Sequence, residues 1–155
     1  MSETIAVYID GENASHQDIE AISSEIKSYG SIIISRVYGD WSDENMRKWL
    51  DSTIIYDIIP IQCVRIYGKN SSDIKLCVDI MKDLYTVPKI SLFYIITTDS
   101  DYSHVISEIK ILDKKVYCIG NSDSNISPAY IYDKYTHIDS IRNDTPKKYI
   151  NKTYF

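Results

Sequence analysis

Residues 5–13 read IAVYIDGEN, an apolar run that ends abruptly in two acids and an amide. The run Ile5–Ile9 has the β-branched and aromatic character of a strand that is covered on both faces. Asp10, Glu12 and Asn13 follow at once, although negative charges that lie close together and near a core are unfavourable. The segment therefore predicts a buried strand that carries acidic groups to one edge of a sheet, where a positively charged partner would stabilise them.

Four further apolar runs have the same character, and segments with apolar residues at steps of three and four separate them. This alternation predicts an α/β fold, with a mainly parallel central sheet of about five strands flanked by helices in three layers. A segment at residues 51–60 fits either a helix or a strand, and residues 135–138 form a possible last strand. The four runs are Ile32–Tyr38, Ile61–Tyr67, Leu92–Thr97 and Val116–Ile119, and helices are expected at about residues 15–29, from about 42, at 72–85 and after 101.

The helix expected at residues 72–85 has a continuous apolar stripe, which predicts the face that packs on the sheet. Residues 1–139 are expected to form the domain, and residues 140–155 a tail of unclear structure. The inward residues of the helix would be Ile74, Cys77, Val78, Met81 and Leu84.

The composition is that of an ordinary soluble domain, with 44% apolar and 25% charged residues. The formal net charge of −5 lacks the basic excess common in nucleic-acid binders, although clustered acids that bind cations would also lower it. Cys63, Cys77 and Cys118 lie in apolar runs without metal-binding spacing, which favours core positions in a reducing compartment. With no signal peptide and no membrane-length apolar run, a cytoplasmic location is expected.

Carboxylates from three separate segments are predicted to meet at one edge of the sheet. Asp10 follows the first strand, Asp73 opens the helix after the third, and Asp99 and Asp101 follow the fourth. In an open parallel sheet, ligands bind beyond the carboxyl ends of the strands. A divalent cation such as Mg²⁺ is the natural partner of such a cluster. Taken singly, each acid also fits a turn or a helix cap.

Three stretches, YIDGEN, KNSSDIKLCVDIM and IITTDSDYSHVI, together resemble the NYN domain, the branch of the PIN-like ribonuclease superfamily that includes the LabA-like (DUF88) proteins. The resemblance extends over about residues 5–139. Thr98, Tyr102 and Glu12 depart from the residues usual in the family. The positions that match the family pattern are Asp10, Asn13, Lys69, Asp73, Asp79, Asp99 and Asp101.

The resemblance implies an endoribonuclease that depends on Mg²⁺ or Mn²⁺ and hydrolyses phosphodiester bonds in RNA, most readily in single strands. It implies Asp10, Asp73, Asp99 and Asp101 as metal ligands and catalytic residues, and Asn13, Lys69 and Ser100 as substrate-binding residues. Asp79, Glu12 and His104 lie near these positions without an assigned role. A homodimer is expected as well. Tyr38, Trp41 and Tyr67 end predicted strands at the same edge, where unpaired bases would stack on their rings.

Two other functions fit parts of the pattern. A PIN-like module that binds RNA or a protein without catalysis would keep the fold, but it would have no reason to keep the full acidic set. A haloacid-dehalogenase-like phosphatase also begins with an aspartate after the first strand. That family has a second aspartate two residues later, where this chain has Glu12. A DxD nucleotide-sugar transferase is a third and more distant alternative, because most such domains are longer.

Overall fold

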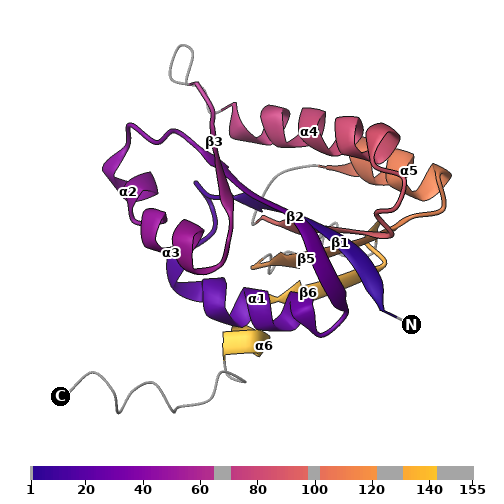
Figure 1. Cartoon of the computed structure of the whole chain (residues 1–155), viewed down its shortest axis with the longest axis horizontal. Coiled ribbons are helices and arrows are strands. Elements are labelled where there is room, and N and C mark those ends of the chain that lie inside the picture. The colour runs from indigo at the N-terminus through magenta and orange to yellow at the C-terminus, as the bar shows by residue number, and fades with distance from the viewer. Residues whose placement is uncertain (1, 65–70, 98–101, 122–130, 143–155) are drawn as a thin grey trace.

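One sheet of six parallel strands runs through the centre of the computed structural model, which describes residues 2–64, 71–97, 102–121 and 131–142 (Figure 1). The strand order, β3-β2-β1-β4-β5-β6, is that of a doubly wound fold, in which the order reverses between β1 and β4. The strands are β1 (Glu3–Asp10), β2 (Gly30–Gly39), β3 (Ile59–Gln62), β4 (Leu92–Ile96), β5 (Lys115–Gly120) and β6 (Lys134–His137).

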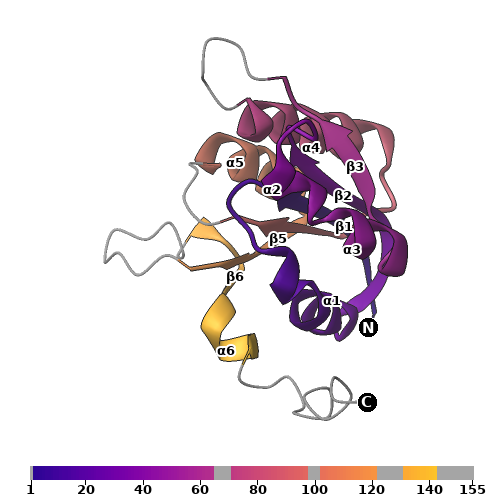
Figure 2. The ribbon, with the colours of Figure 1, turned by 90° about the vertical axis from the view of Figure 1, so that its left-hand side faces the viewer.

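Helices cover both faces of the sheet, as Figures 1 and 2 show. α4 (Ser72–Thr86) and α5 (Ser103–Ile111) lie together on one face. The other face carries the short helix η1 (His16–Asp18), α1 (Ile19–Lys27) and α6 (Ile138–Arg142). The remaining helices, α2 (Glu44–Arg47) and α3 (Leu50–Ile55), connect β2 to β3.

The two faces of β1 contribute to two separate hydrophobic cores. Ala6 and Tyr8 point into the core beneath α4 and α5, whereas Ile5, Val7 and Ile9 point into the core beneath α1 and α6. Each of these residues is at most 2% exposed. The prediction of a central strand covered on both sides is confirmed, and with it the three-layer α/β fold.

The sheet has six strands rather than about five. The sixth strand, β6, confirms the possible last strand at residues 135–138 to within one residue. Its polar sequence KYTH lies at an edge, so no apolar run marks it. β3 begins two residues earlier than the predicted Ile61, at Ile59. The ambiguous segment at residues 51–60 therefore contains both the end of α3 and the start of β3.

The inward face of α4 differs from the prediction. Ile74 and Val78 are 65% and 54% exposed, while Leu76 and Ile80 are fully buried. The reason is that the inward face also carries acids, which an apolar stripe does not reveal. The buried residues of α4 are Ser72, Leu76, Asp79, Ile80, Asp83 and Leu84.

Other sequence predictions have mixed outcomes. Cys63 and Cys118 are buried and Cys77 is half-buried, each as a free thiol. The predicted domain end at residue 139 falls within α6, and the division into domain and tail stays a prediction. None of the helices in the described part of the chain is long and apolar enough to cross a membrane.

Candidate active site

Asp10 is the last residue of β1 and is fully buried. Its Oδ2 accepts a hydrogen bond from the side-chain nitrogen of Asn13 at 2.7 Å. The hydroxyl of Ser72, the first residue of α4, makes a longer contact of 3.5 Å with its Oδ1. Two predicted site residues, Asp10 and Asn13, are therefore in contact, and Ser72 joins them although the sequence analysis did not select it. The position of Ser72 next to Asp73, at the predicted start of a helix, could have indicated that it belongs to the site.

The turn after β1 holds Asn13 in position. The backbone N–H groups of Asn13 and Ala14 both donate to the carbonyl oxygen of Asp10, at 3.2 and 2.8 Å. The N–H of Gly11 donates to the carbonyl of Tyr38 on β2 at 2.9 Å. These bonds turn the chain back over the end of the sheet, so that the Asn13 amide reaches the Asp10 carboxylate.

Glycine is required at position 11 because the turn packs closely on its neighbours. A Cβ atom there would lie 2.7 Å from a side-chain carbon of Val37 and from one of Met46. The indole N–H of Trp49 also donates to the carbonyl of Gly11, at 3.1 Å. Trp49 is only 2% exposed, so a buried aromatic ring supports the turn next to Asp10.

Burial raises the pKa of Asp10 above its usual range, and the negative charges of Glu12 and Asp73 raise it further. The hydrogen bonds from Asn13 and from the backbone of Glu12 oppose this rise. Glu12 also links two loops, because its Oε1 accepts the backbone N–H of Asp40 at 3.0 Å. The ionised form of Asp10 is thus unfavourable in the folded protein, which is the condition that a nearby cation would relieve.

Asp73 lies in the first turn of α4, next to Ser72, and is half-buried. Its Oδ1 accepts the backbone N–H of Ile74 at 2.9 Å. A carboxylate in this position is stabilised by the positive end of the helix dipole. Ser72 contacts Asp10 at 3.5 Å, so the first turn of α4 lies at the end of β1, where the charge of Asp73 raises the pKa of Asp10.

Asp79 lies further along α4, buried against the sheet. It accepts hydrogen bonds from the hydroxyl of Tyr38 at 2.8 Å and from Lys75 Nζ at 3.0 Å. Tyr38 is fully buried, so the prediction that it stacks on RNA bases is wrong. Both contacts hold α4 on the sheet, so we assign Asp79 a structural role.

A third acid of α4, Asp83, also bonds to buried groups of the sheet. It accepts hydrogen bonds from the Tyr8 hydroxyl at 2.7 Å and from Arg36 at 2.5 Å. Burial, together with the bond to Asp83, raises the pKa of Tyr8. Asp79 and Asp83 explain which face of α4 is turned toward the sheet. If the helix rotated about its axis, the buried groups that bond to these acids would lose their hydrogen bonds.

Several predicted site residues cannot be compared with the structure. Lys69, Asp99, Ser100 and Asp101 lie outside the described residues, as does Tyr67. His104 is exposed on α5. Within residues 2–64, 71–97, 102–121 and 131–142, no three His, Cys, Asp or Glu side chains gather as a metal-binding group. Asp10 and Asp73 provide two oxygen-bearing acids of the kind that Mg²⁺ or Mn²⁺ binds.

Two hollows adjoin the turn after β1. The larger, of about 420 Å³, lies between this turn and α2, with Glu12, His16 and Lys48 in its wall. The smaller, of about 200 Å³, lies between the turn, the ends of β4 and β5, and α6. We call the smaller hollow the Thr97 pocket, after the residue that follows β4. The smaller one opens where β1 and β4 diverge, the usual place for ligands in such sheets.

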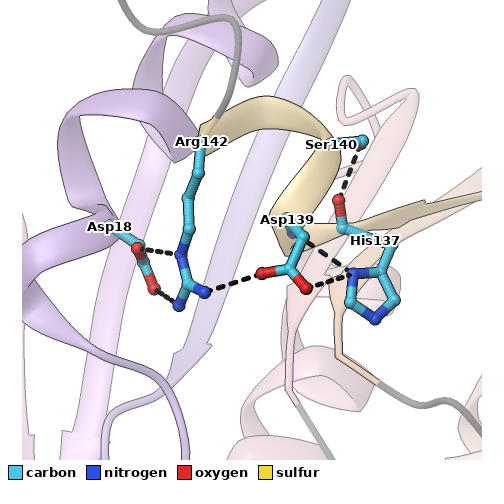
Figure 3. Close-up of polar contacts among 5 residues, drawn as sticks. All are labelled: Asp18, His137, Asp139, Ser140 and Arg142. Atoms are coloured by element: carbon cyan, nitrogen blue, oxygen red, sulfur yellow. Dashed lines mark hydrogen bonds and ion pairs between the residues drawn. The ribbon is translucent and has the colours of Figure 1, made fainter.

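Figure 3 shows how α6 is held beside the Thr97 pocket. The guanidinium of Arg142 donates to both carboxylate oxygens of Asp18, each at 2.7 Å, and also to Asp139 at 2.8 Å. Asp18 ends η1, and Arg142 ends α6. The contact joins segments 124 residues apart and closes one side of the pocket.

The family model of the NYN domain matches residues 4–140. The chain belongs to the NYN family. NYN domains are part of the PIN-like nuclease superfamily, and the match includes Asp10, Asn13, Asp73 and the end of β4. No curated protein is significantly similar to the chain.

A solved structure supports the fold of this NYN domain. The crystal structure of a protein of unknown function from Vibrio parahaemolyticus resembles it with a TM-score of 0.69. The match covers 90% of this chain and 95% of that protein, at 16% sequence identity. At this identity, the likeness concerns the fold alone.

Proposed function

We propose that this NYN domain is a metal-dependent endoribonuclease that hydrolyses phosphodiester bonds in RNA at the end of β1. The observation that carries the proposal is the buried Asp10, whose pKa burial raises while Asp73 lies close enough to raise it further. An acid in this state is stabilised by a bound cation. Because the superfamily consists of nucleases, the substrate that such a bound ion would act on is a nucleic acid.

In this proposal Asp10, Asp73, Asp99 and Asp101 hold Mg²⁺ or Mn²⁺, directly or through water. When bound, the ion would polarise the phosphoryl group and lower the pKa of the attacking water. Asn13 orients the Asp10 carboxylate through its 2.7 Å hydrogen bond. Lys69 and Ser100 contact the RNA backbone. Single-stranded RNA and the homodimer remain predictions from the resemblance, and the cytoplasmic location remains a prediction from the sequence.

The contacts of Glu12 favour this proposal over a haloacid-dehalogenase-like phosphatase. That family has a second aspartate two residues after the first. Here the residue is a glutamate, and its carboxylate accepts the backbone N–H of Asp40 at 3.0 Å. It therefore links the loops that follow β1 and β2.

Cleavage of a labelled single-stranded RNA with Mn²⁺ tests the proposal. We expect cleavage by the wild type, none with EDTA, and a loss of at least about 100-fold in Asp10→Asn. Asp113→Asn is a matched control, because Asp113 is exposed at the opposite end of the sheet, just before β5. Equal cleavage by Asp10→Asn and the wild type would contradict the assignment.

Thermal stability tests the metal separately from catalysis. A site that binds only the folded state raises stability by RT ln(1 + [L]/Kd), which is about 2.7 kcal/mol at a concentration of 100 Kd. Mn²⁺ should therefore raise the Tm of the wild type and of Asp113→Asn, but not that of Asp10→Asn. A Mn²⁺ effect without RNA cleavage would instead favour the non-catalytic module.

A further inference from the structure

The larger of the two hollows, which we call the α2 hollow, lies between two segments that are distant in the sequence. The turn after β1, together with η1, forms one side of its wall, and α2 forms the other. Met46 and Trp49, each 2% exposed, lie behind this wall. The volume of about 420 Å³ is within the roughly 300–1,000 Å³ that is typical of small-molecule sites. The hollow therefore has room for one nucleotide.

Four side chains with polar groups border the α2 hollow without a polar partner in the described part of the chain. His16 and Gln17 come from η1, whereas Asn45 belongs to α2 and Lys48 follows it. The His16 ring contacts Trp49 edge-on, with 6.3 Å between the ring centroids. Among the described residues, the polar atoms of these four side chains make no hydrogen bond or ion pair. They approach the hollow from two sides, so one polar ligand could bond to several of them.

The charges of the wall favour a ligand that has both an anionic and a neutral polar part. Lys48 supplies a permanent positive charge. Glu12 and Asp43 supply two negative charges, although each already accepts a backbone N–H, from Asp40 at 3.0 Å and from Asn45 at 2.9 Å. Two acids beside one lysine do not suit a bare inorganic anion. A nucleotide fits better, because its phosphate can approach the ammonium while its hydroxyl groups donate to carboxylate and amide oxygens.

The α2 hollow and the Asp10 carboxylate lie on opposite sides of the same turn. The carboxylate points toward α4, where Ser72 contacts it at 3.5 Å. The hollow lies on the α2 side, and its wall includes Gly11 and Glu12, the two residues that follow Asp10. An RNA strand that crosses this turn can therefore place one phosphate at Asp10 and a neighbouring nucleotide in the hollow.

We propose that the α2 hollow binds one nucleotide of the RNA strand, next to the phosphodiester that is cleaved. Lys48 contacts a phosphate of this nucleotide, and the amides of Gln17 and Asn45 bond to its neutral polar groups. This inference rests on the proposed ribonuclease function and deepens it, because it names residues that hold the substrate beside the acidic groups. These residues contribute to RNA affinity and not to the chemical step.

The side-chain amide signals of the isotope-labelled protein test where RNA binds. A single-stranded RNA hexanucleotide is added in EDTA, so that no metal-dependent cleavage occurs, and inorganic phosphate at the same concentration is the comparison. We expect the RNA to shift the NH₂ signals of Gln17 and Asn45, and phosphate to leave them in place. RNA that leaves both signals unshifted, or phosphate that shifts them equally, would overturn the proposal.

Substitution of Lys48 tests the phosphate contact. Lys48→Met removes the charge and should weaken RNA binding about threefold to tenfold. One phosphate contact on a single strand contributes about 0.7 to the slope of log K against log salt concentration, so the slope should fall by that amount. Lys89→Met is the matched control, because Lys89 is exposed in the turn before β4, at the opposite end of the sheet. Equal affinities and equal salt slopes in the two variants would overturn the proposal.

Cleavage kinetics separate this inference from the proposed function. If the wild type cleaves RNA and Lys48→Met raises KM while kcat is unchanged, both stand. If cleavage requires Asp10 but KM is the same in Lys48→Met and the wild type, the assignment of the hollow fails and the ribonuclease remains. If RNA binding depends on Lys48 but no RNA is cleaved, the hollow binds RNA and the ribonuclease assignment fails.

Discussion

The hydroxyl of Tyr38 donates a hydrogen bond to Asp79 at 2.8 Å, joining β2 to α4 inside the core. Both residues are buried, and burial together with this bond raises the pKa of Tyr38. α4 begins with Ser72 and Asp73 at the end of β1. A contact near the middle of the helix therefore helps to hold its first turn beside Asp10.

Tyr38→Phe should lower the free energy of unfolding by about 1–3 kcal/mol, because Asp79 loses one of its buried donors. Tyr94→Phe is the matched comparison: Tyr94 is equally buried, but its hydroxyl has no partner among the described residues. That change should leave stability equal or slightly higher. Urea denaturation measures both, and an equal loss in the two variants would show that the Tyr38–Asp79 bond contributes nothing specific.

Two substitutions test the orientation of α4. Leu76→Ala should cost about 2–5 kcal/mol, because Leu76 is fully buried and the change leaves a cavity. Val78→Ala should stay within about 0.5 kcal/mol of the wild type, since Val78 is 54% exposed. Both values come from chemical denaturation. A larger loss of stability in Val78→Ala than in Leu76→Ala would instead support the inward face that the apolar stripe predicts.

Asp10→Asn should stabilise the metal-free protein while it abolishes activity. Asparagine is neutral; its amide oxygen can accept from Asn13, and its amide N–H group can donate to the Ser72 hydroxyl in place of the bond that the carboxylate accepts. We therefore expect a higher Tm in EDTA at neutral pH, where 1 kcal/mol corresponds to about 2–4 °C in a domain of this size. A lower Tm would mean that the carboxylate makes a favourable contribution that the raised pKa does not predict.

The difference between Asp10→Asn and the wild type should depend on pH. The pKa of Asp10 is raised in the folded protein above its usual value of 3.8, so the folded state binds the proton first as the pH falls. The wild type then gains stability relative to the variant as the pH drops through the folded-state pKa, and the gain is complete below 3.8. Urea titrations in EDTA from pH 7 downward check this sign. A difference that widens on acidification would refute it.

The pairing of Arg142 with Asp18 should be measurable by a double-mutant cycle with Arg142→Met and Asp18→Asn. The two bonds of 2.7 Å form a bidentate contact, and we expect a coupling of about 1 kcal/mol. The cycle with Asp139→Asn is the control, because that carboxylate is 66% exposed and should couple by less than about 0.5 kcal/mol. Equal couplings would mean that the geometry in Figure 3 does not favour Asp18.

The sequence was sufficient for the features that depend on neighbouring residues. The covered strand β1, the acid at its end and the amide three residues later follow from IAVYIDGEN, and the family resemblance agrees with the match over residues 4–140. Alternation of strands and helices restricts the topology strongly, which explains why a parallel sheet could be predicted.

Features that depend on distant partners could not be predicted. Of the predicted inward residues of α4, Leu84 is buried and Cys77 and Met81 pack against the core, but Ile74 and Val78 are exposed. Asp79 and Asp83 count as polar in any periodicity, and only Tyr38, Tyr8 and Arg36 make their burial favourable. The Thr97 pocket is built from the turn after β1, the ends of β4 and β5, and α6. No local pattern indicates that these segments meet.

The indole of Trp49 provides an optical probe of the β1 turn. Its N–H donates a hydrogen bond to the carbonyl of Gly11, the residue next to Asp10. The chain contains two tryptophans. Trp41→Phe would leave Trp49 as the sole tryptophan fluorophore. Its emission would then report any rearrangement of that turn when a divalent ion is added, without a label and without RNA.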